Sequence, residues 1–213
     1  MQVAMMLYAG FQLLEVSDAM DVFQEANRLR GQTFYEPRLL GPSCGSVFAS
    51  SGAALATADC YARATGAFDI VMVPGSPLAD TTPDHRQVVE WLRHAGATTP
   101  RIASLSSGAL LVARAGLADK HWITTQRRYV RRLADEYPST HVFASEACVK
   151  DGNLYSSGSA RAGLHLALAL VREDLGARTA DQIGVSLGLP VQAADTSAAR
   201  SNPLDKAARW TPT

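Results

Sequence analysis

Apolar residues fall along the chain in two patterns, short continuous runs and longer stretches with helical periodicity. Continuous apolar runs are typical of parallel strands that are buried on both faces. They predict strands at residues 2–8, 68–75 and 101–105. Apolar positions that recur every three or four residues predict amphipathic helices, several of which end at a glycine. These helices are expected at residues 16–29, 84–96, 107–115 and 160–175.

The remaining segments have shorter and less regular patterns. They predict a strand at 34–41, a short hairpin at 46–60, a helix at 126–137, and two strands within 141–157 joined by a turn at 150–153. Ser17 or Asp18 is expected to cap the first helix, and residues 179–189 to form a final packing helix rather than a DNA reader. Periodicity then ceases, so we divide the chain into an α/β domain at 1–192 and an irregular tail at 193–213.

Strands that alternate with helices predict βαβ units. Such units build a mostly parallel sheet sandwiched by helices, which places the chain in the α/β class. Ligand sites in these sheets lie at the carboxyl ends of the strands. The sequence "ASLSSGALL" (103–111) joins a predicted strand to the next helix and therefore lies at this edge.

Composition narrows the classes of function. A length of 213 residues with 47% hydrophobic content suits one domain. Twenty Lys and Arg residues balance twenty Asp and Glu residues, so the chain lacks the basic surplus of a free-standing nucleic-acid binder. Any DNA contact would be local or come through a partner. Four arginines at helical spacing are interpreted as a solvated face or a partner contact: Arg127, Arg128, Arg131 and Arg132.

The cysteines and the N-terminus bear on the compartment. Cys44, Cys60 and Cys148 are widely spaced, with no CxxC pair and no nearby histidine pattern, so neither a disulfide framework nor a zinc site is predicted. No apolar run approaches the roughly 20 residues that span a bilayer, and the N-terminus lacks the basic region and cleavage site of a signal peptide. We expect a soluble cytoplasmic protein without membrane contact.

The turn Ser104–Leu105–Ser106–Ser107–Gly108 has the spacing of a nucleophile elbow, with a small residue two positions before and two after the central one. Small neighbours are needed because the central residue adopts a strained backbone conformation. The following helix directs its N–H groups toward the central side chain. The alternative is that these serines only cap a helix, since turns rich in Ser and Gly are common.

Four segments carry a resemblance to a known family, and together they cover residues 2 to about 176. They read "GFQLLEVSDAMDVFQEAN", "FDIVMVPGS", "IASLSSGALLVARAGLADKHWITTQ" and "VKDGNLYSSGSARAGLHLALALVREDLG". In this combination the chain resembles the ThiJ/PfpI group of the class I glutamine amidotransferase-like superfamily. It is most similar to the branch found as the N-terminal domain of AraC-type transcriptional regulators and in isonitrile hydratases. The resemblance implies a flavodoxin-like fold.

The resemblance also assigns three reactive positions, and two of them have changed. The family's elbow cysteine corresponds to Ser106, its acidic residue to Glu15 and its histidine to Gln126. A cysteine at an elbow reacts as a thiolate, whereas a serine needs a positioned base, and glutamine cannot exchange a proton near neutral pH. Glu15 would be a poor base for an alcohol. For the three nearby histidines we favour structural or surface roles over catalysis: His121, His141 and His165.

The groups that bind a ligand are expected to be better preserved in this sequence than the groups that would react with it. By resemblance, the N–H of Ser107 and an N–H around Gly75–Ser76 would form an oxyanion pocket that can hold a ligand carboxylate or carbonyl. Glu15 and Gln126 would add polar contacts within a small, mostly apolar cleft. We expect a small polar metabolite as ligand, and neither a cofactor nor a metal ion.

Two functions are therefore weighed. The first is a non-catalytic small-molecule-sensing domain of an AraC-type regulator, homodimeric, which reaches DNA only through a domain not present in this chain. The alternative is a small-molecule hydratase or hydrolase of the isonitrile hydratase type, in which Ser106 and Glu15 would be catalytic. A stress-protein activity of the wider superfamily has the least support, because those activities are ascribed to the cysteine.

Overall fold

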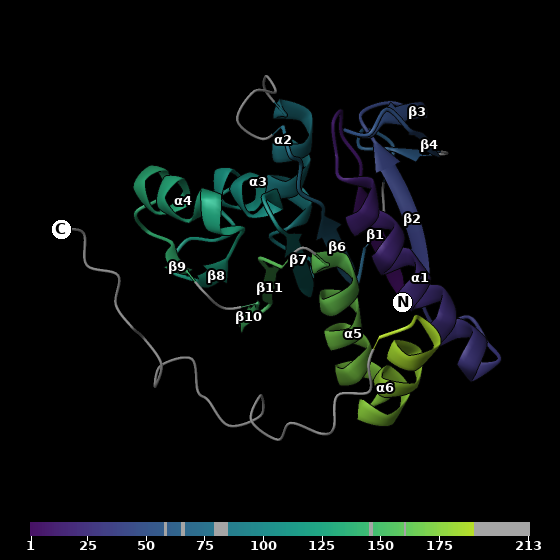
Figure 1. Cartoon of the computed structure of the whole chain (residues 1–213). Helices are drawn as coiled ribbons and strands as arrows, with labels where there is room; N and C mark the ends of the chain where they lie inside the picture. Colours follow the sequence, from purple (N-terminus) through teal and green to yellow (C-terminus); the bar gives the residue numbers. More distant parts are fainter. Residues whose placement is uncertain (58, 65–66, 79–84, 145–146, 160, 190–213) are drawn as a thin grey trace.

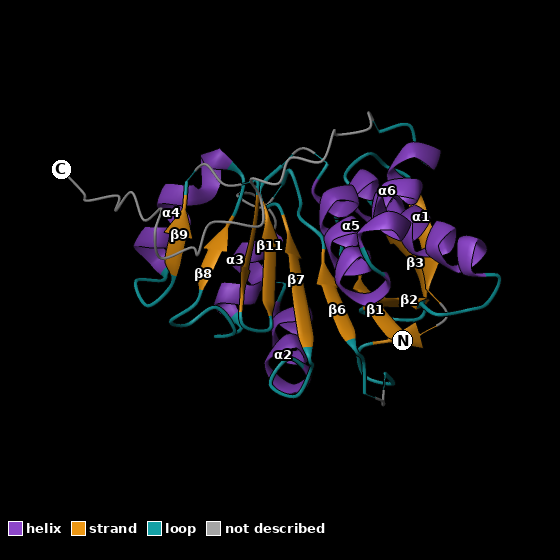
Figure 2. Ribbon diagram, turned by 90° about the horizontal axis from the view of Figure 1, so that it is seen from below, coloured by secondary structure: helices purple, strands orange, loops and turns teal. Residues whose placement is uncertain are grey.

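The computed structural model describes residues 1–57, 59–64, 67–78, 85–144, 147–159 and 161–189. Within these residues a seven-stranded sheet has the order β10-β11-β7-β6-β1-β2-β5 (Figures 1 and 2). Its strands are β1 Gln2–Met6, β2 Glu36–Gly41, β5 Asp59–Cys60, β6 Ile70–Val73, β7 Arg101–Leu105, β10 Cys148–Asp151 and β11 Leu154–Ser157. All neighbouring pairs are parallel except β10 with β11, so the expected mostly parallel α/β sheet is confirmed.

Helices cover both faces of the sheet. They are α1 Leu13–Arg30, α2 Arg86–Ala95, α3 Gly108–Arg114, α4 Val130–Glu136, α5 Ala162–Leu175 and α6 Ala177–Ser186. Helices α1, α5 and α6 contact one another on one face, while α2 contacts α3 and α3 contacts α4 on the other (Figure 1). Helix α6 buries Ala180, Ile183 and Gly184, so it is a packing helix, as predicted.

The central strands form the core because their side chains are apolar on both faces. In β1, residues 3–6 are fully buried, and all four residues of β6 are buried as well. This agrees with the continuous apolar runs that predicted them. The register pairs Val73 of β6 with Ser104 of β7, and Leu105 of β7 with Ser157 of β11. The carboxyl ends of these strands therefore meet at one edge of the sheet.

Several expected boundaries are corrected. The hairpin predicted at 46–60 is β3 Gly45–Phe48 with β4 Ala54–Thr57, and the residues after it pair instead with β2. Within 141–157 the structure has three strands rather than two. The first, β9 His141–Phe143, pairs with β8 Trp122–Thr124. Strand β8 was not predicted, because three residues are too few for a recognisable pattern.

The predicted cap of the first helix is wrong. Helix α1 begins at Leu13, three residues before the predicted start, and its N-cap is Gln12. The Ser17 hydroxyl donates to the Leu14 carbonyl inside the helix, and Asp18 binds Arg161, the residue before α5, instead of the helix end. Tertiary contacts therefore decide the start of α1.

The predicted helix at 126–137 is a 3-10 turn, Arg127–Tyr129, followed by α4. Residues 190–213, including the predicted irregular tail, lie outside the described residues, and the division at residue 192 stays a prediction. Among the described residues, no helix is long and apolar enough to cross a membrane.

Candidate functional site

The turn between β7 and α3 has the backbone of a nucleophile elbow. Ser106 has a φ of 55°, in the left-handed region that residues other than glycine rarely adopt. Its N–H donates to the Ser157 carbonyl at 2.6 Å, and its own carbonyl accepts from Thr125 Oγ1 at 2.9 Å. At Gly108 a Cβ atom would lie 2.2 Å from the Val73 carbonyl oxygen, which explains why glycine stands two positions later. The serines are therefore more than helix caps.

Glu15 lies in the first turn of α1, against the elbow. Its side chain is 1% exposed, and Oε2 accepts a hydrogen bond of 2.6 Å from the Gly75 N–H. Glu15 Oε1 and Ser106 Oγ are both buried and make no hydrogen bond of normal geometry with the described residues, although the Ser106 hydroxyl is near enough to Glu15 to lower the pKa of its carboxyl group. Two polar atoms with unused hydrogen-bonding capacity are thus buried in one place.

Burial raises the pKa of Glu15 from its usual value of 4.5 to about 7. The Gly75 N–H and the Ser106 hydroxyl favour the charged form and lower the pKa, while the nearby charge of Asp18 raises it. Burial is the strongest of these effects. Near neutral pH, Glu15 is therefore divided between its protonated and ionised forms.

The position of Glu15 depends on close packing between α1 and α5. A Cβ atom at Gly163 of α5 would lie 2.0 Å from the Glu15 carbonyl oxygen, so only glycine allows this approach. Asp18, one turn later in α1, accepts two hydrogen bonds from Arg161, from Nε at 2.7 Å and from Nη2 at 3.1 Å. Sequence reasoning missed both supports, because the partners are more than 140 residues apart.

The amide groups around Gly75 and Ser76 differ from the expected oxyanion pocket. The Gly75 N–H is bonded to Glu15, and the Ser76 N–H donates to Ser107 Oγ at 2.8 Å. The Ser107 hydroxyl donates in turn to the Ser76 carbonyl at 2.9 Å. Both amides therefore serve the protein itself, and a ligand would have to displace one of these bonds. The Glu15 carboxyl group occupies the Gly75 amide, and the Ser107 hydroxyl occupies the Ser76 amide.

Gln126 lies beside the elbow only through its neighbour. Thr125 contacts the Ser106 carbonyl, but the Gln126 Oε1 atom accepts a hydrogen bond of 3.1 Å from Arg128 Nε on the exposed side. The structure thus brings together Glu15, Gly75, Ser76, Ser106 and Ser107. The Gln126 side chain is engaged away from them.

The three histidines do not bond to the elbow serine. His121 Nδ1 lies 3.4 Å from Asp151, and the His141 ring stacks on Trp122, both at the end of the sheet opposite the elbow. His165 Nδ1 lies 3.1 Å from Ser159 Oγ. Burial, with a smaller effect of the Arg161 charge, lowers the pKa of His165. These contacts agree with structural roles, and Ser106 has no histidine base among the described residues.

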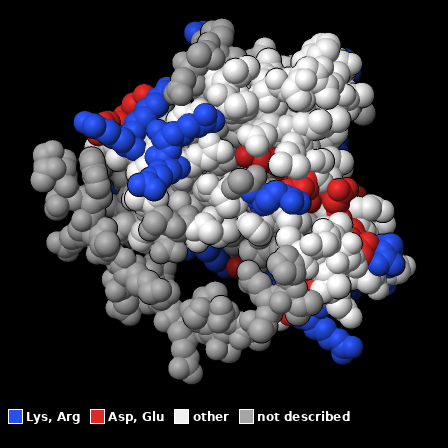
Figure 3. All heavy atoms as spheres, in the orientation of Figure 1, with Lys and Arg blue, Asp and Glu red and all other residues white. Residues whose placement is uncertain are grey.

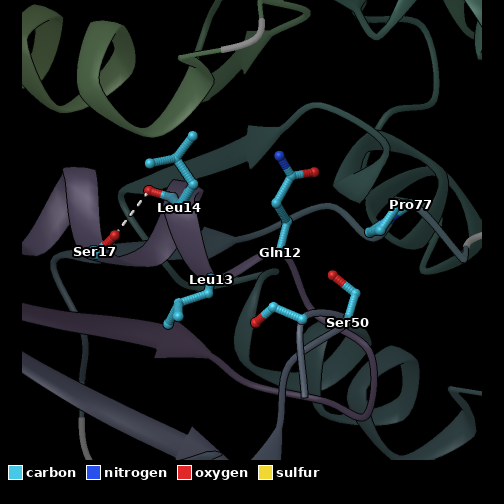
Figure 4. A pocket seen from close by; sticks show the side chains of 7 residues that line it. Gln12, Leu13, Leu14, Ser17, Ser50 and Pro77 are labelled. Carbon is cyan, nitrogen blue, oxygen red and sulfur yellow. Dashed lines mark hydrogen bonds between the residues drawn. The ribbon is translucent and has the colours of Figure 1, made fainter. Parts of the chain in front are cut away.

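An open depression lies beside the first turn of α1. Its volume is about 460 Å³, and it is lined by Gln12, Leu13, Leu14, Ser17, Ser50, Ser51 and Pro77. Gln12, Ser50 and Pro77 lie around one space, with the two leucines at its side (Figure 4). The lining has no charged side chain. Ser106 and Glu15 are not part of it, although Glu15 follows Leu14 directly in the helix.

The arginines of residues 127–132 form an exposed basic group over α4 (Figure 3). Arg131 pairs with Asp135 at 3.6 Å and Arg132 with Glu136 at 2.7 Å. The Arg128 guanidinium lies 4.7 Å from the centre of the Tyr129 ring. These local pairs favour a solvated face, one of the two interpretations given above. Among the described residues no cluster of three His, Cys, Asp or Glu side chains could hold a metal ion.

The fold and the elbow define a class of protein: an α/β domain in which a strained residue after a central strand lies against a buried carboxyl group. The profile of the DJ-1/PfpI family matches residues 1–173, so the chain belongs to the DJ-1/PfpI family. The resemblance inferred from the sequence is confirmed, and with it the flavodoxin-like fold.

The curated relatives of this chain include both a transcriptional regulator and an enzyme. The chain is 30% identical over 179 residues to the HTH-type transcriptional regulator GlxA of Rhizobium meliloti (strain 1021). The aligned region covers 82% of this chain and 53% of GlxA. It is 28% identical over 120 residues to isonitrile hydratase of Pseudomonas putida. That alignment covers 56% of this chain and 51% of the hydratase. The chain spans about half the length of these relatives.

A solved structure of an AraC family transcriptional regulator from Pseudomonas putida has a TM-score of 0.76 to this chain. It is 22% identical, and the match covers 88% of this chain and 99% of that one. At this identity the likeness establishes the fold alone. Regulators and an enzyme thus both occur among the proteins similar to this chain.

Proposed function

We propose that the chain is a non-catalytic small-molecule-sensing domain of an AraC-type transcriptional regulator. The observation that carries the proposal is the state of the elbow. Ser106 keeps the strained backbone, but it has no histidine base among the described residues, and the amides of Gly75 and Ser76 are bonded within the protein. A hydroxyl without a histidine base, beside Gly75 and Ser76 amides that are already bonded, is poorly equipped for acyl transfer.

The depression beside α1 is the proposed ligand site. It offers apolar contacts from Leu13, Leu14 and Pro77, and hydrogen-bonding groups from Gln12 and Ser50. Because no charged side chain lines it, an uncharged metabolite with both polar and apolar parts fits better than a strong acid or base. The polar pair Glu15 and Ser106 lies behind the first turn of α1, where a shift of that turn would expose it.

The partners follow from the same proposal. The protein would act in the cytoplasm as a homodimer and would reach DNA only through a domain outside these 213 residues. The similarity to GlxA supports this proposal, since GlxA is an HTH-type transcriptional regulator. The chain's formal charge of zero also suits a domain that does not itself bind nucleic acid.

One observation favours the alternative, a hydratase or hydrolase that uses Ser106. A carboxyl group with a pKa near the working pH is suited to take and return a proton, and the pKa of Glu15 is about 7. Glu15 would then act as the base for Ser106. The similarity to isonitrile hydratase over 56% of the chain is consistent with this alternative.

The experiment is ligand-observed NMR with a panel of neutral and charged metabolites, including isonitriles, read for both binding and disappearance. The proposal predicts binding without consumption. Ser50→Trp, at the depression, should abolish binding, whereas Ser46→Trp, an exposed serine at the other end of the same hairpin, should leave it intact. Consumption that stops in both Ser106→Ala and Glu15→Gln would establish the enzyme and refute the sensor.

A further inference from the structure

Two cysteines that are widely spaced in the sequence, Cys44 and Cys60, lie close together at the base of the β3–β4 hairpin. Cys44 directly precedes β3 and is exposed, while Cys60 ends β5 and is 8% exposed. The two thiol groups share a hydrogen bond. The elbow and the depression use neither of them. The third cysteine, Cys148, lies in β10 at the opposite edge of the sheet.

The backbone on the Cys60 side is fixed by the main sheet. Cys60 is the register partner of Gly41, the last residue of β2. The next residue continues the pairing, since the Tyr61 N–H donates to the Gly41 carbonyl at 2.9 Å. The segment from residue 41 to Cys44 therefore starts directly beside Cys60.

The backbone on the Cys44 side is fixed by Thr57, the last residue of β4. Thr57 Oγ1 lies 3.0 Å from the Ser43 carbonyl oxygen and 3.1 Å from that of Gly45, so it holds the chain on both sides of Cys44. Thr57 itself is buried. The backbone segments that carry the two cysteines are thus held side by side by the fold, as a disulfide between them requires.

The charges around the pair set its reactivity. Arg63 Nη1 lies 4.0 Å from Cys44 Sγ, and Asp59 adjoins the same thiol. The pKa of Cys44 is raised, mainly by the hydrogen bond with Cys60 and then by burial, while Arg63 acts in the opposite direction. A thiol with a raised pKa reacts slowly with peroxides, because the thiolate is the nucleophile. The thiolate fraction limits the first step of exchange with a disulfide in the same way, whereas the nearness of the second thiol favours the intramolecular step that follows.

We propose that Cys44 and Cys60 form a reversible intramolecular disulfide by exchange with a low-molecular-weight disulfide. The Cys44 thiolate attacks one sulfur of the small disulfide, breaks its S–S bond and releases one small thiol. The Cys60 thiolate then attacks the Cys44 sulfur of the mixed disulfide and expels the second small thiol. The protein dithiol loses two electrons and two protons, which the small disulfide takes up as two thiols.

The bond would close the ends of the hairpin that forms one wall of the depression. The hairpin turn carries Ser50 and Ser51, and the Ser50 N–H donates to the Phe11 carbonyl at 3.0 Å. Cross-linking the base of the hairpin restricts its movement, so oxidation would change ligand affinity. This coupling rests on the proposed ligand site, whereas disulfide formation does not.

The test equilibrates the whole chain with glutathione and glutathione disulfide in varied ratios, blocks free thiols by alkylation, and identifies linked peptides by mass. We expect a Cys44–Cys60 link in the unaltered protein and in Cys148→Ser. Linked peptide should exceed glutathionylated Cys44 by on the order of tenfold or more, since a thiol in contact has a high effective concentration. Cys60→Ala should instead stop at glutathionylated Cys44.

Three results would overturn the proposal. Glutathionylated Cys44 could accumulate while Cys60 can still be alkylated, or both thiols could stay reduced when glutathione disulfide is the only glutathione species added. The third is a disulfide that links Cys44 or Cys60 to Cys148. The main result comes from the unaltered protein and Cys148→Ser, so it does not depend on the stability of Cys60→Ala. Slower hydrogen exchange at the Ser50 amide after oxidation would support the coupling to the depression, and unchanged exchange would refute it. A failure to bind any metabolite would leave the glutathione result unaffected.

Discussion

Replacing Glu15 by glutamine removes the buried titrating group while keeping an oxygen that can accept the Gly75 N–H. In the native protein the pKa of Glu15 is raised from 4.5 to about 7. Between these two pH values the folded state therefore binds more protons than the unfolded state, and the stability contributed by this group falls as pH rises. Below about 4.5 both states are protonated, and above about 7 both are ionised, so the change is confined to this window.

The magnitude follows from the size of the shift. A difference of about 2.5 pH units corresponds to about 3.5 kcal/mol over the whole titration, at about 1.4 kcal/mol per unit. Since the Glu15 side chain is 1% exposed, solvent screening removes little of this value. The free energy of unfolding of the unaltered protein, minus that of Glu15→Gln, should fall by about 3 kcal/mol between pH 4.5 and about 8 and stay constant above that.

Urea unfolding at half-unit pH steps from 4.5 to 8.5 measures this difference. The matched control is Glu90→Gln, which removes a carboxyl group from the exposed side of α2. A difference for Glu15→Gln that is flat across the window, or that grows with pH, would show that the carboxyl group is not held in a desolvated state. The conclusion that Glu15 is partly protonated near neutral pH would then fail.

Three further predictions concern the supports of the site. Gly163→Ala should lower the free energy of unfolding by roughly 1–3 kcal/mol in urea unfolding, because its Cβ meets the Glu15 carbonyl, whereas Gly184→Ala, with room for a Cβ, should cost little. Ser107→Ala should cost roughly 1–3 kcal/mol by leaving a buried N–H without its acceptor, and a neutral effect would mean that the loop rearranges. Asp18→Asn should shift the Glu15 stability profile to lower pH, and an unshifted profile would exclude Asp18 as a cause of the raised pKa.

Local sequence signals were enough to predict the parts of the fold that are decided locally. The strand at 101–105 was placed at its observed bounds, because an apolar run between a proline and a serine-rich turn has few alternatives. Strand β8 was missed, since three residues carry no period. The start of α1 was misplaced because Asp18, a good cap by type, is used by Arg161 in a pair that spans 143 residues.

The candidate site divides in the same way. The position of Ser106 could be taken from the elbow motif, which is a local feature, whereas Glu15 was assigned only by resemblance to the family. The hydrogen bonds that occupy the amides of Gly75 and Ser76 could not, because they depend on where the side chains of Glu15 and Ser107 point. The contact between the two thiols at the base of the hairpin was also invisible, since wide spacing in sequence says nothing about a register between β2 and β5.

The strained backbone of the elbow at Ser106 has a structural cause. A left-handed conformation in a residue other than glycine costs free energy and persists only where the surroundings impose it. Here Gly108 is pressed against the Val73 carbonyl, and the Ser157 carbonyl holds the Ser106 N–H. The strain therefore belongs to the packing of three strands and a helix, and it would remain whatever side chain the elbow carried. Elbow geometry alone is thus no measure of catalysis in this fold, and the decisive observation is whether a base reaches the hydroxyl.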